Sequence, residues 1–154
     1  MSDDIKKIIE IDAPAEVVFN ALIDPKELTQ WFPDKAVFEP RVGGKMHLTF
    51  FPTQNRNKES VLNGEVIEFV PNKKLSYTFV PVESCAPGMP QDIKIKPTIV
   101  TWNIEEISKN KSRLTLTHSG FTKELDEMHK KTSAGWSYFV GRLEEYLKKK
   151  SINS

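Results

Sequence analysis

The stretch from Leu125 to Leu147, LDEMHKKTSAGWSYFVGRLEEYL, decides the architecture that the rest of the chain must take. Its large apolar side chains recur every three or four residues, and most of its lysines and glutamates lie off that stripe. This pattern is typical of a helix with one broad apolar face. A helix of about 25 residues spans roughly 37 Å and must lie along something broad. We expect its partner to be the concave side of a curved sheet.

The middle of the chain, from about Lys35 to Ser119, alternates apolar and polar residues with a period of two. Such alternation predicts strands with one buried face. The segments are joined by short turns, such as the one around Asn110, and consecutive strands joined in this way pair antiparallel. We therefore expect an antiparallel sheet, in which Gly64 marks a bulge or a close approach of two backbones.

One strand and two short helices are predicted before the sheet. Residues Ile5–Ile11 are rich in β-branched side chains and predict a strand. Asp12-Ala13-Pro14 predicts a helix start, because a carboxylate can cap free N–H groups and proline fits the first turn. Asp24-Pro25 repeats this logic, and Glu27 stands three residues after Asp24, where it could complete a capping box.

Composition bounds the class of protein. The 154 residues, 38% hydrophobic and 28% charged, fit one globular domain, which we expect to span residues 1–154. With 22 basic and 21 acidic residues the net charge is +1, which argues against nucleic acid as a partner because no long-range field gathers a polyanion. The acidic N-terminus is unlike a signal peptide, and no apolar run approaches the roughly 20 residues that cross a bilayer. We expect a cytoplasmic protein with no membrane span.

No motif for catalysis, metal binding or cofactor binding stands out. The single cysteine, Cys85, argues against a disulfide framework and a multi-cysteine zinc site, and the three histidines have no metal-ligand spacing. Gly43-Gly44-Lys45 lacks the spacing of a phosphate loop and is more typical of a hairpin turn. We expect no metal, no cofactor and no catalytic residue. The aperiodic loop 81–97, which contains four prolines, has the length of a lid or a binding loop.

His118 stands apart from the other histidines, because it shares the inward face of its strand with Leu114 and Leu116. A hydrogen-bonded interior histidine is the more common case, and a catalytic acid or base is the rarer one. If the interior holds a cavity, His118 is also a natural polar contact for a ligand.

The remaining signal is a set of large side chains expected between the sheet and the C-terminal helix. Such a set either fills a core or lines a pocket, and both interpretations stay open at this stage. In the second case Tyr77, Trp102 and His118 supply the polar groups, and Tyr77 and His118 orient the ligand. The predicted ligand-binding residues are Phe38, Met46, Leu48, Phe50, Tyr77, Phe79, Trp102, Leu116, His118, Trp136, Phe139, Val140 and Leu143.

Several runs of residues carry a family resemblance. The run Ile11–Phe19 (IDAPAEVVF), followed by Asp24-Pro25 and Trp31-Phe32, resembles the opening of the START-like or SRPBCC superfamily, which includes the birch pollen allergens. The resemblance is narrowed to one branch of this superfamily by two further runs, Phe38–Lys45 (FEPRVGGK) and Leu116–Phe121 (LTHSGF), and by the pair Gly135-Trp136 of the C-terminal helix. Together they resemble the AHSA-like branch, which is similar to the C-terminal domain of the activator of the heat-shock chaperone ATPase.

This resemblance implies an α+β helix-grip fold, a curved antiparallel sheet wrapped around a long C-terminal helix, with two short helices after the first strand. Relatives in the superfamily bind lipids and other apolar molecules under that helix, and some polyketide cyclases and aromatases use the same cavity for chemistry. The eukaryotic chaperone activator has a further N-terminal domain for which this chain has no room, and the loop 81–97 departs from the shorter connection expected of the branch.

Three functions follow as hypotheses. We favour the binding of a small hydrophobic molecule, aromatic or lipid-like, in a cavity between the sheet and the C-terminal helix, by a monomer or weak homodimer. The alternative, implied by the resemblance alone, is a chaperone co-factor in the stress response that binds a heat-shock chaperone through its surface. The second alternative is a cyclase-like enzyme with His118 as acid or base. We expect a binding protein rather than an enzyme.

Overall fold

The computed structural model describes residues 4–50, 60–81, 98–120 and 126–152. The elements follow one another as β1 (Ile5–Ile11), α1 (Ala15–Ile23), α2 (Pro25–Trp31), β2 (Lys35–Phe38), β3 (Lys45–Phe50), β4 (Ser60–Val70), β5 (Lys74–Pro81), β6 (Thr98–Ser108), β7 (Lys111–Ser119) and α3 (Asp126–Ile152). This is the predicted order, with two short helices after the first strand and a helix of 27 residues at the end. Cys85 and most of the predicted loop 81–97 lie outside the described residues.

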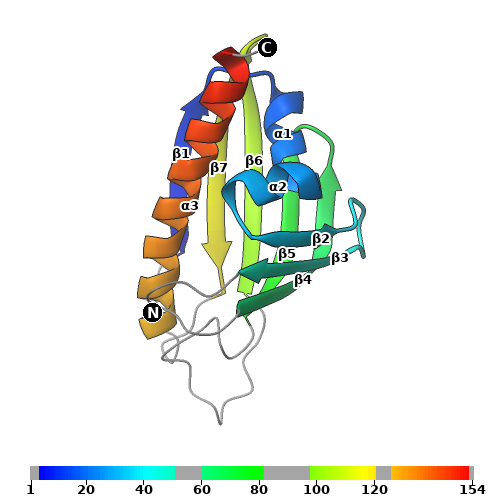
Figure 1. The fold of residues 1–154 in the computed structure, drawn as a ribbon, viewed down its shortest axis with the longest axis vertical. Helices are drawn as coiled ribbons and strands as arrows, with labels where there is room; N and C mark the ends of the chain where they lie inside the picture. Colours follow the sequence, from blue (N-terminus) through cyan, green and yellow to red (C-terminus); the bar gives the residue numbers. More distant parts are fainter. Residues whose placement is uncertain (1–3, 51–59, 82–97, 121–125, 153–154) are drawn as a thin grey trace.

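The strands form one seven-stranded sheet in the order β1-β7-β6-β5-β4-β3-β2. Every pair of neighbours is antiparallel. Figure 1 shows β2 and β3 turned strongly relative to β6 and β7, so that the sheet curves around the helices. Helix α3 runs along β1 and β7, while α1 and α2 cover the sheet beside it. The predicted α+β helix-grip architecture is confirmed.

The two short helices begin differently. Pro14 is the N-cap residue of α1, and no side chain caps that helix, so the predicted cap by Asp12 is wrong. Asp24 does cap α2, because its carboxylate accepts a hydrogen bond from the backbone N–H of Lys26 at 2.9 Å. Glu27 does not complete a capping box; its carboxylate instead contacts side chains of α3 and joins the two helices.

Gly64 marks a close approach of two strands, as predicted. A Cβ atom at this position of β4 would lie 2.2 Å from the carbonyl oxygen of Thr78 on β5. The same pair of strands shifts register between Val66 and Glu68. The absence of a side chain therefore lets β4 and β5 pair closely just before the irregularity that bends the sheet.

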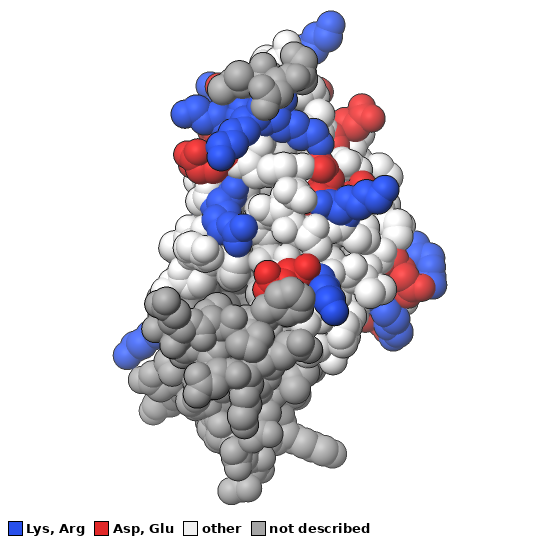
Figure 2. Space-filling view, in the orientation of Figure 1, with Lys and Arg blue, Asp and Glu red and all other residues white. Residues whose placement is uncertain are grey.

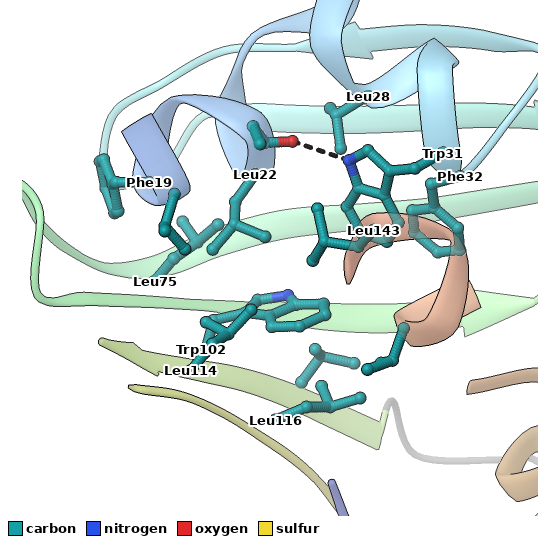
Figure 3. Close-up of a cluster of buried hydrophobic side chains, with 14 of the residues drawn as sticks. Phe19, Leu22, Leu28, Trp31, Phe32, Leu75, Trp102, Leu114, Leu116 and Leu143 are labelled. Carbon is teal, nitrogen blue, oxygen red and sulfur yellow. Dashed lines mark hydrogen bonds between the residues drawn. The ribbon is translucent and has the colours of Figure 1, made fainter. Parts of the chain in front are cut away.

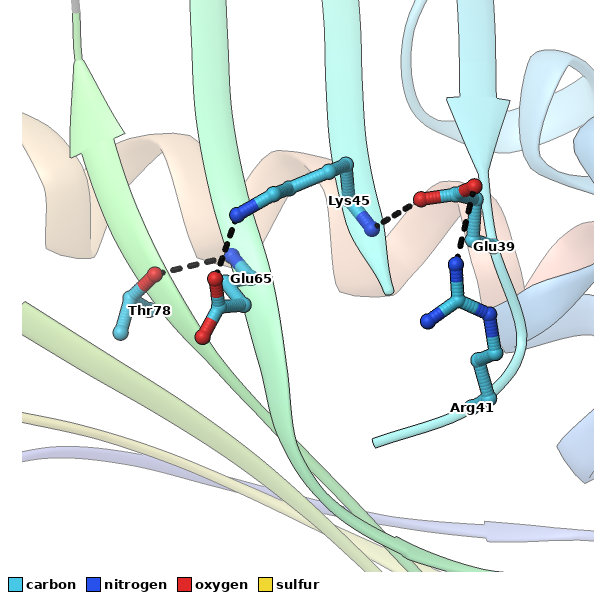
Figure 4. A network of polar contacts seen from close by, with 5 residues as sticks. All are labelled: Glu39, Arg41, Lys45, Glu65 and Thr78. Carbon is cyan, nitrogen blue, oxygen red and sulfur yellow. Dashed lines mark hydrogen bonds and ion pairs between the residues drawn. The ribbon is translucent and has the colours of Figure 1, made fainter. Parts of the chain in front are cut away.

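The turn before β3 is held by glycine and by a polar network (Figure 4). Gly43 has a φ of +83°, a conformation that glycine adopts without strain, which confirms the predicted hairpin turn. The carboxylate of Glu39 accepts from the backbone N–H of Lys45 at 2.7 Å and also pairs with Arg41. The ammonium group of Lys45 reaches Glu65 on β4. The run 38–45 thus fastens β2 and β3 to the next strand.

The core lies between the sheet and the three helices (Figure 3). Trp31 and Trp102 are each 1% exposed and meet edge to face, with ring centroids 6.0 Å apart. The indole N–H of Trp31 donates to the carbonyl oxygen of Ala21 at 2.9 Å, so this polar group is satisfied inside the core. Helix α3 buries Trp136, Val140, Leu143 and Leu147, which confirms the predicted stripe from Trp136 onward, while Leu125 lies outside the described residues.

The face of the molecule drawn in Figure 2 carries charges of both signs. Figure 2 shows lysine and arginine interspersed with acidic residues over the face that it presents, in keeping with the net charge of +1. Within the described part of the chain, no helix combines the length and the apolar character that crossing a membrane requires.

Candidate functional site

The predicted site residues all lie within the described part of the chain and belong to one core cluster around α3 or contact it directly. Twelve of them are buried, with at most 9% of their surface exposed, and Phe139 is half-buried. The period of two in β3, β5, β6 and β7 therefore predicted the inward face of each strand correctly. Their role in ligand binding stays a prediction.

Ring contacts around Trp136, direct or through Phe32, link five aromatic members of this set: Phe50, Phe79, Trp102, Trp136 and Phe139. The ring centroid of Trp136 lies 5.6 Å from that of Trp102 and 6.0 Å from that of Phe79. Phe32 packs against Trp136 at 5.2 Å and against Phe139 at 5.0 Å. Ring pairs at such distances attract one another beyond the burial of their area. We call this connected group of rings between the sheet and α3 the aromatic wall.

Phe32 and Thr98 join this wall although they were not among the predicted site residues. Phe32 is the C-cap residue of α2, and its contact with Trp136 depends on how α2 packs across the sheet. The aromatic pair Trp31-Phe32 was visible in the sequence, but nothing local gave its direction. Thr98 begins β6 and has the same parity as the inward-facing Val100 and Trp102, so extending that alternation back by two residues could have found it.

His118 is fully buried and is hydrogen-bonded at both ring nitrogens. The indole N–H of Trp136 donates to Nδ1 at 2.9 Å, and Nε2 lies 2.7 Å from the hydroxyl oxygen of Thr98. A neutral ring with its proton on Nε2 satisfies both contacts. Thr98 then donates to the carbonyl oxygen of Phe79 at 3.1 Å. This chain of hydrogen bonds joins β5, β6, β7 and α3.

The surroundings keep His118 uncharged. Burial lowers the pKa of His118 to about 3, and the charge of His129 is a smaller cause in the same direction. A general acid or base works best with a pKa near the operating pH and within reach of the substrate. A neutral imidazole whose nitrogens both bond to protein groups is instead a hydrogen-bonded interior histidine, the more common of the two predicted roles.

Tyr77 and Trp102 form a second buried polar pair. The indole N–H of Trp102 donates to the hydroxyl oxygen of Tyr77 at 3.0 Å. Burial raises the pKa of Tyr77, and the hydrogen bond from Trp102 offsets only part of that effect. The hydroxyl is therefore a neutral phenol that accepts from one side.

The described interior holds no ionic side chain. The buried polar residues are Thr49, Ser76, Thr98, Ser112 and His118. Among the described residues no group of three or more histidine, cysteine, aspartate or glutamate side chains is placed to hold a metal ion. What this interior offers a guest is aromatic surface and uncharged hydrogen-bonding groups.

A hollow of about 790 Å³ lies on another part of the molecule. It is bounded by the start of α1 and by the turns that join β4 to β5 and β6 to β7, with Lys73, Lys109, Glu16 and Glu106 among its lining. None of the predicted site residues lines it. This hollow is therefore separate from the aromatic cluster.

Comparisons with known proteins find a matching family model and similar folds. The model described as activator of Hsp90 ATPase homolog 1-like protein matches residues 12–148. No curated protein gives a significant match.

Three solved structures illustrate the likeness of fold. Protein MLL2253 from Mesorhizobium loti is 25% identical with a TM-score of 0.73, and the match covers 94% of this chain and 97% of that one. The Aha1 dimer from Colwellia psychrerythraea is 21% identical with a TM-score of 0.72, over 96% of this chain and 97% of that one. DynU16, from the dynemicin biosynthetic locus, is 22% identical with a TM-score of 0.73, over 96% of this chain and 48% of that one.

Proposed function

The chain belongs to the family of activator of Hsp90 ATPase homolog 1-like proteins, whose model covers residues 12–148, and we propose that this member binds a small hydrophobic molecule, aromatic or lipid-like, between the sheet and α3. One observation carries the proposal: the interior presents a continuous aromatic wall with uncharged polar groups and no ionic side chain in its described part. Apolar walls with a few fixed polar groups are the usual composition of small-molecule sites.

The expected affinity follows from the area that such a ligand would bury. Removing about 300 Å² of apolar surface from water gains about 7 kcal/mol at roughly 25 cal/mol per Å². Micromolar binding requires about 8 kcal/mol, and association itself costs several kcal/mol. About 3 kcal/mol then remains, so we expect a compound with two fused rings to bind with a dissociation constant in the millimolar range.

Native mass spectrometry of the purified protein and a thermal-shift screen of neutral aromatic compounds test this proposal. We expect either a small molecule carried through purification or a concentration-dependent rise in the melting temperature. Phe139→Ala should weaken binding of a screening hit severalfold, because this half-buried ring belongs to the aromatic wall. Tyr138→Ala is the matched control, since Tyr138 is the next residue of α3 and is 61% exposed. If no compound is carried over and none shifts the melting temperature, the proposal fails.

The family match favours a second candidate, the stimulation of a heat-shock chaperone ATPase through the surface of the domain. The similar structure of the Aha1 dimer also makes a homodimer a candidate state for this chain. ATP hydrolysis by the cognate chaperone, measured with and without this protein, tests the first point, and sedimentation velocity tests the second. If a stoichiometric excess of this protein does not stimulate ATP hydrolysis by the chaperone, the chaperone role is wrong.

An enzyme of the cyclase type has less support. DynU16 shares the fold, but the histidine that would act as acid or base has both nitrogens bonded to protein groups. If a substrate is identified and exchange of His118 for glutamine leaves its turnover unchanged, His118 is not the catalytic acid or base. A loss of turnover with ligand affinity unchanged would instead support catalysis.

A further inference from the structure

Most buried polar groups of the described interior are used by other groups of the protein. The three indole N–H groups donate to the carbonyl oxygen of Ala21 (from Trp31), the hydroxyl of Tyr77 (from Trp102) and Nδ1 of His118 (from Trp136). The remaining nitrogen of His118 bonds to Thr98, which in turn donates to a backbone carbonyl. These groups therefore have few unused hydrogen-bond donors or acceptors for a bound ligand.

The hydroxyl proton of Tyr77 is the exception. A hydroxyl can donate one hydrogen bond and accept two. The oxygen of Tyr77 accepts from Trp102 at 3.0 Å, so its proton must point elsewhere, and it meets no acceptor among the residues that the structure describes. Tyr77 is 3% exposed, which leaves water little access to that proton. A buried donor without an acceptor is costly, and a bound molecule could supply the missing partner.

The charge of the guest is limited by the same surroundings. Burial keeps Tyr77 in its protonated form and His118 in its neutral form, so neither offers a charge. No aspartate, glutamate, lysine or arginine is buried in the described part of the chain. A carboxylate or an ammonium group brought into this interior would lose its hydration without gaining an ionic partner.

We infer that the ligand is a neutral molecule whose apolar body carries a hydrogen-bond acceptor, such as a ketone or ester carbonyl, and that this acceptor takes the proton of Tyr77. The inference rests on the proposed function and narrows its ligand class. Trp102 acts as the positioning residue, because its N–H fixes the direction of the hydroxyl. A free fatty acid, ionised at neutral pH, falls outside this class.

Three naphthalenes of similar size test separately whether the ligand must be neutral and whether it must carry a hydrogen-bond acceptor. 2-Acetylnaphthalene is neutral and carries a carbonyl, 2-isopropenylnaphthalene replaces that oxygen by a CH₂ group of the same shape, and 2-naphthoate is charged. In titration calorimetry we expect the ketone to bind about fivefold more tightly than its hydrocarbon isostere, the usual size of one net hydrogen bond. The carboxylate should bind at least roughly tenfold more weakly than the ketone, because its charge stays unpaired.

Tyr77→Phe tests the assigned group directly. It should bring the ratio of the two neutral affinities close to one, whereas Tyr146→Phe, which removes a hydroxyl bonded to Glu27 at the contact of α2 and α3, should keep the wild-type ratio. If the single variant does not fold, Tyr77→Phe combined with Trp102→Phe removes both partners of the buried pair and leaves no unpaired N–H. The carbonyl stretch of the bound ketone should lie at lower wavenumber in the wild type than in the Tyr77 variant.

The outcomes distinguish this inference from the proposed function. If the ketone and its isostere bind equally well to the wild type, or if the preference survives Tyr77→Phe, the inference is wrong and the proposed function stands. If the carboxylate binds as tightly as the ketone, the requirement for a neutral ligand is wrong. If none of the three compounds binds, the inference is overturned, whereas the proposed function stands or falls with the native mass spectrometry and the thermal-shift screen.

Discussion

The hydrogen bonds of His118 predict how the stability of the protein depends on pH. The change is a fall in pH from 7.5 to 5.0, applied to the wild type and to His118→Gln. Glutamine has no charge in this range, and its amide can accept from Trp136 and donate to Thr98 as the imidazole does. The comparison therefore isolates the protonation of one buried ring.

The sign and the size follow from the two pKa values of this histidine. In the unfolded chain the pKa is about 6.5, whereas in the folded protein burial lowers the pKa of His118 to about 3. As the pH falls, the unfolded state binds the proton first, so the stabilisation is fully present above pH 6.5 and is lost towards pH 3. One pKa unit corresponds to about 1.4 kcal/mol, so the wild type should lose about 2 kcal/mol by pH 5.0 through this group.

Urea unfolding followed by tryptophan fluorescence at pH 7.5, 6.0 and 5.0 measures the effect. The quantity compared is the difference in free energy of unfolding between the two proteins, because the pH dependence that comes from all other groups is common to both. Between pH 7.5 and pH 5.0 the free energy of unfolding of the wild type should fall by about 2 kcal/mol more than that of His118→Gln. His47→Gln, at an exposed histidine of β3, should keep the wild-type dependence because His118 is still present. A difference that does not change with pH would refute the neutral, hydrogen-bonded His118.

Two further predictions concern the fold. Gly64→Ala should lower the free energy of unfolding by about 3 kcal/mol, because its Cβ would lie 2.2 Å from the carbonyl oxygen of Thr78 and the strands would have to separate. Gly141→Ala on α3, where a Cβ meets nothing within 4 Å, should instead raise the free energy of unfolding by up to about 1 kcal/mol. Thermal unfolding measures both variants, and an equal change in stability for the two would contradict this reasoning. Asp24→Ala should cost about 1 kcal/mol through loss of the bond from Lys26, and a neutral result in the same assay would show that this cap contributes nothing.

Periodic patterns made the architecture predictable. In a strand the side chains alternate between the two faces, so one apolar residue on β5 such as Leu75 fixes the direction of Tyr77 and Phe79 as well. In α3 the same reasoning with spacings of three and four placed Trp136 and Leu143 against the sheet. Both patterns are properties of a single element, which a sequence records in full.

Contacts between elements were not predictable in this way. The cap expected of Asp12 fails because α1 begins after Pro14, which has an extended backbone and places Asp12 outside the first turn. Glu27 has the spacing of a capping box, yet its carboxylate bonds to Tyr146 and Lys150, more than a hundred residues along the chain. The local preference of Glu27 for a capping box is therefore outweighed by side chains that only the packing of α2 on α3 brings near it.

The hydrogen-bond partners of the polar groups in the candidate site were likewise not predictable from the sequence. The sequence suggested Tyr77, Trp102 and His118 as separate contacts for a ligand, whereas the structure pairs Trp102 with Tyr77 and His118 with Trp136. These pairs depend on the register of β5 against β6, in which Leu75 lies opposite Trp102, and on the height of α3 along β7. A period of two says that a side chain points inward but not which neighbour it meets there.

The residue that we infer bonds to the ligand lies outside the runs that carry the family resemblance. Of the runs that carry the resemblance, 38–45 fastens β2 and β3 to β4, and the LTHSGF run meets the glycine–tryptophan pair through the bond from Trp136 to His118. These contacts hold the sheet and α3 together, which is why the likeness predicts the fold. Tyr77, whose proton is the donor left for a guest, lies outside every one of those runs. The ligand of this chain can therefore differ from those of other proteins with the same fold, and exchange at Tyr77 should alter ligand choice without altering the architecture.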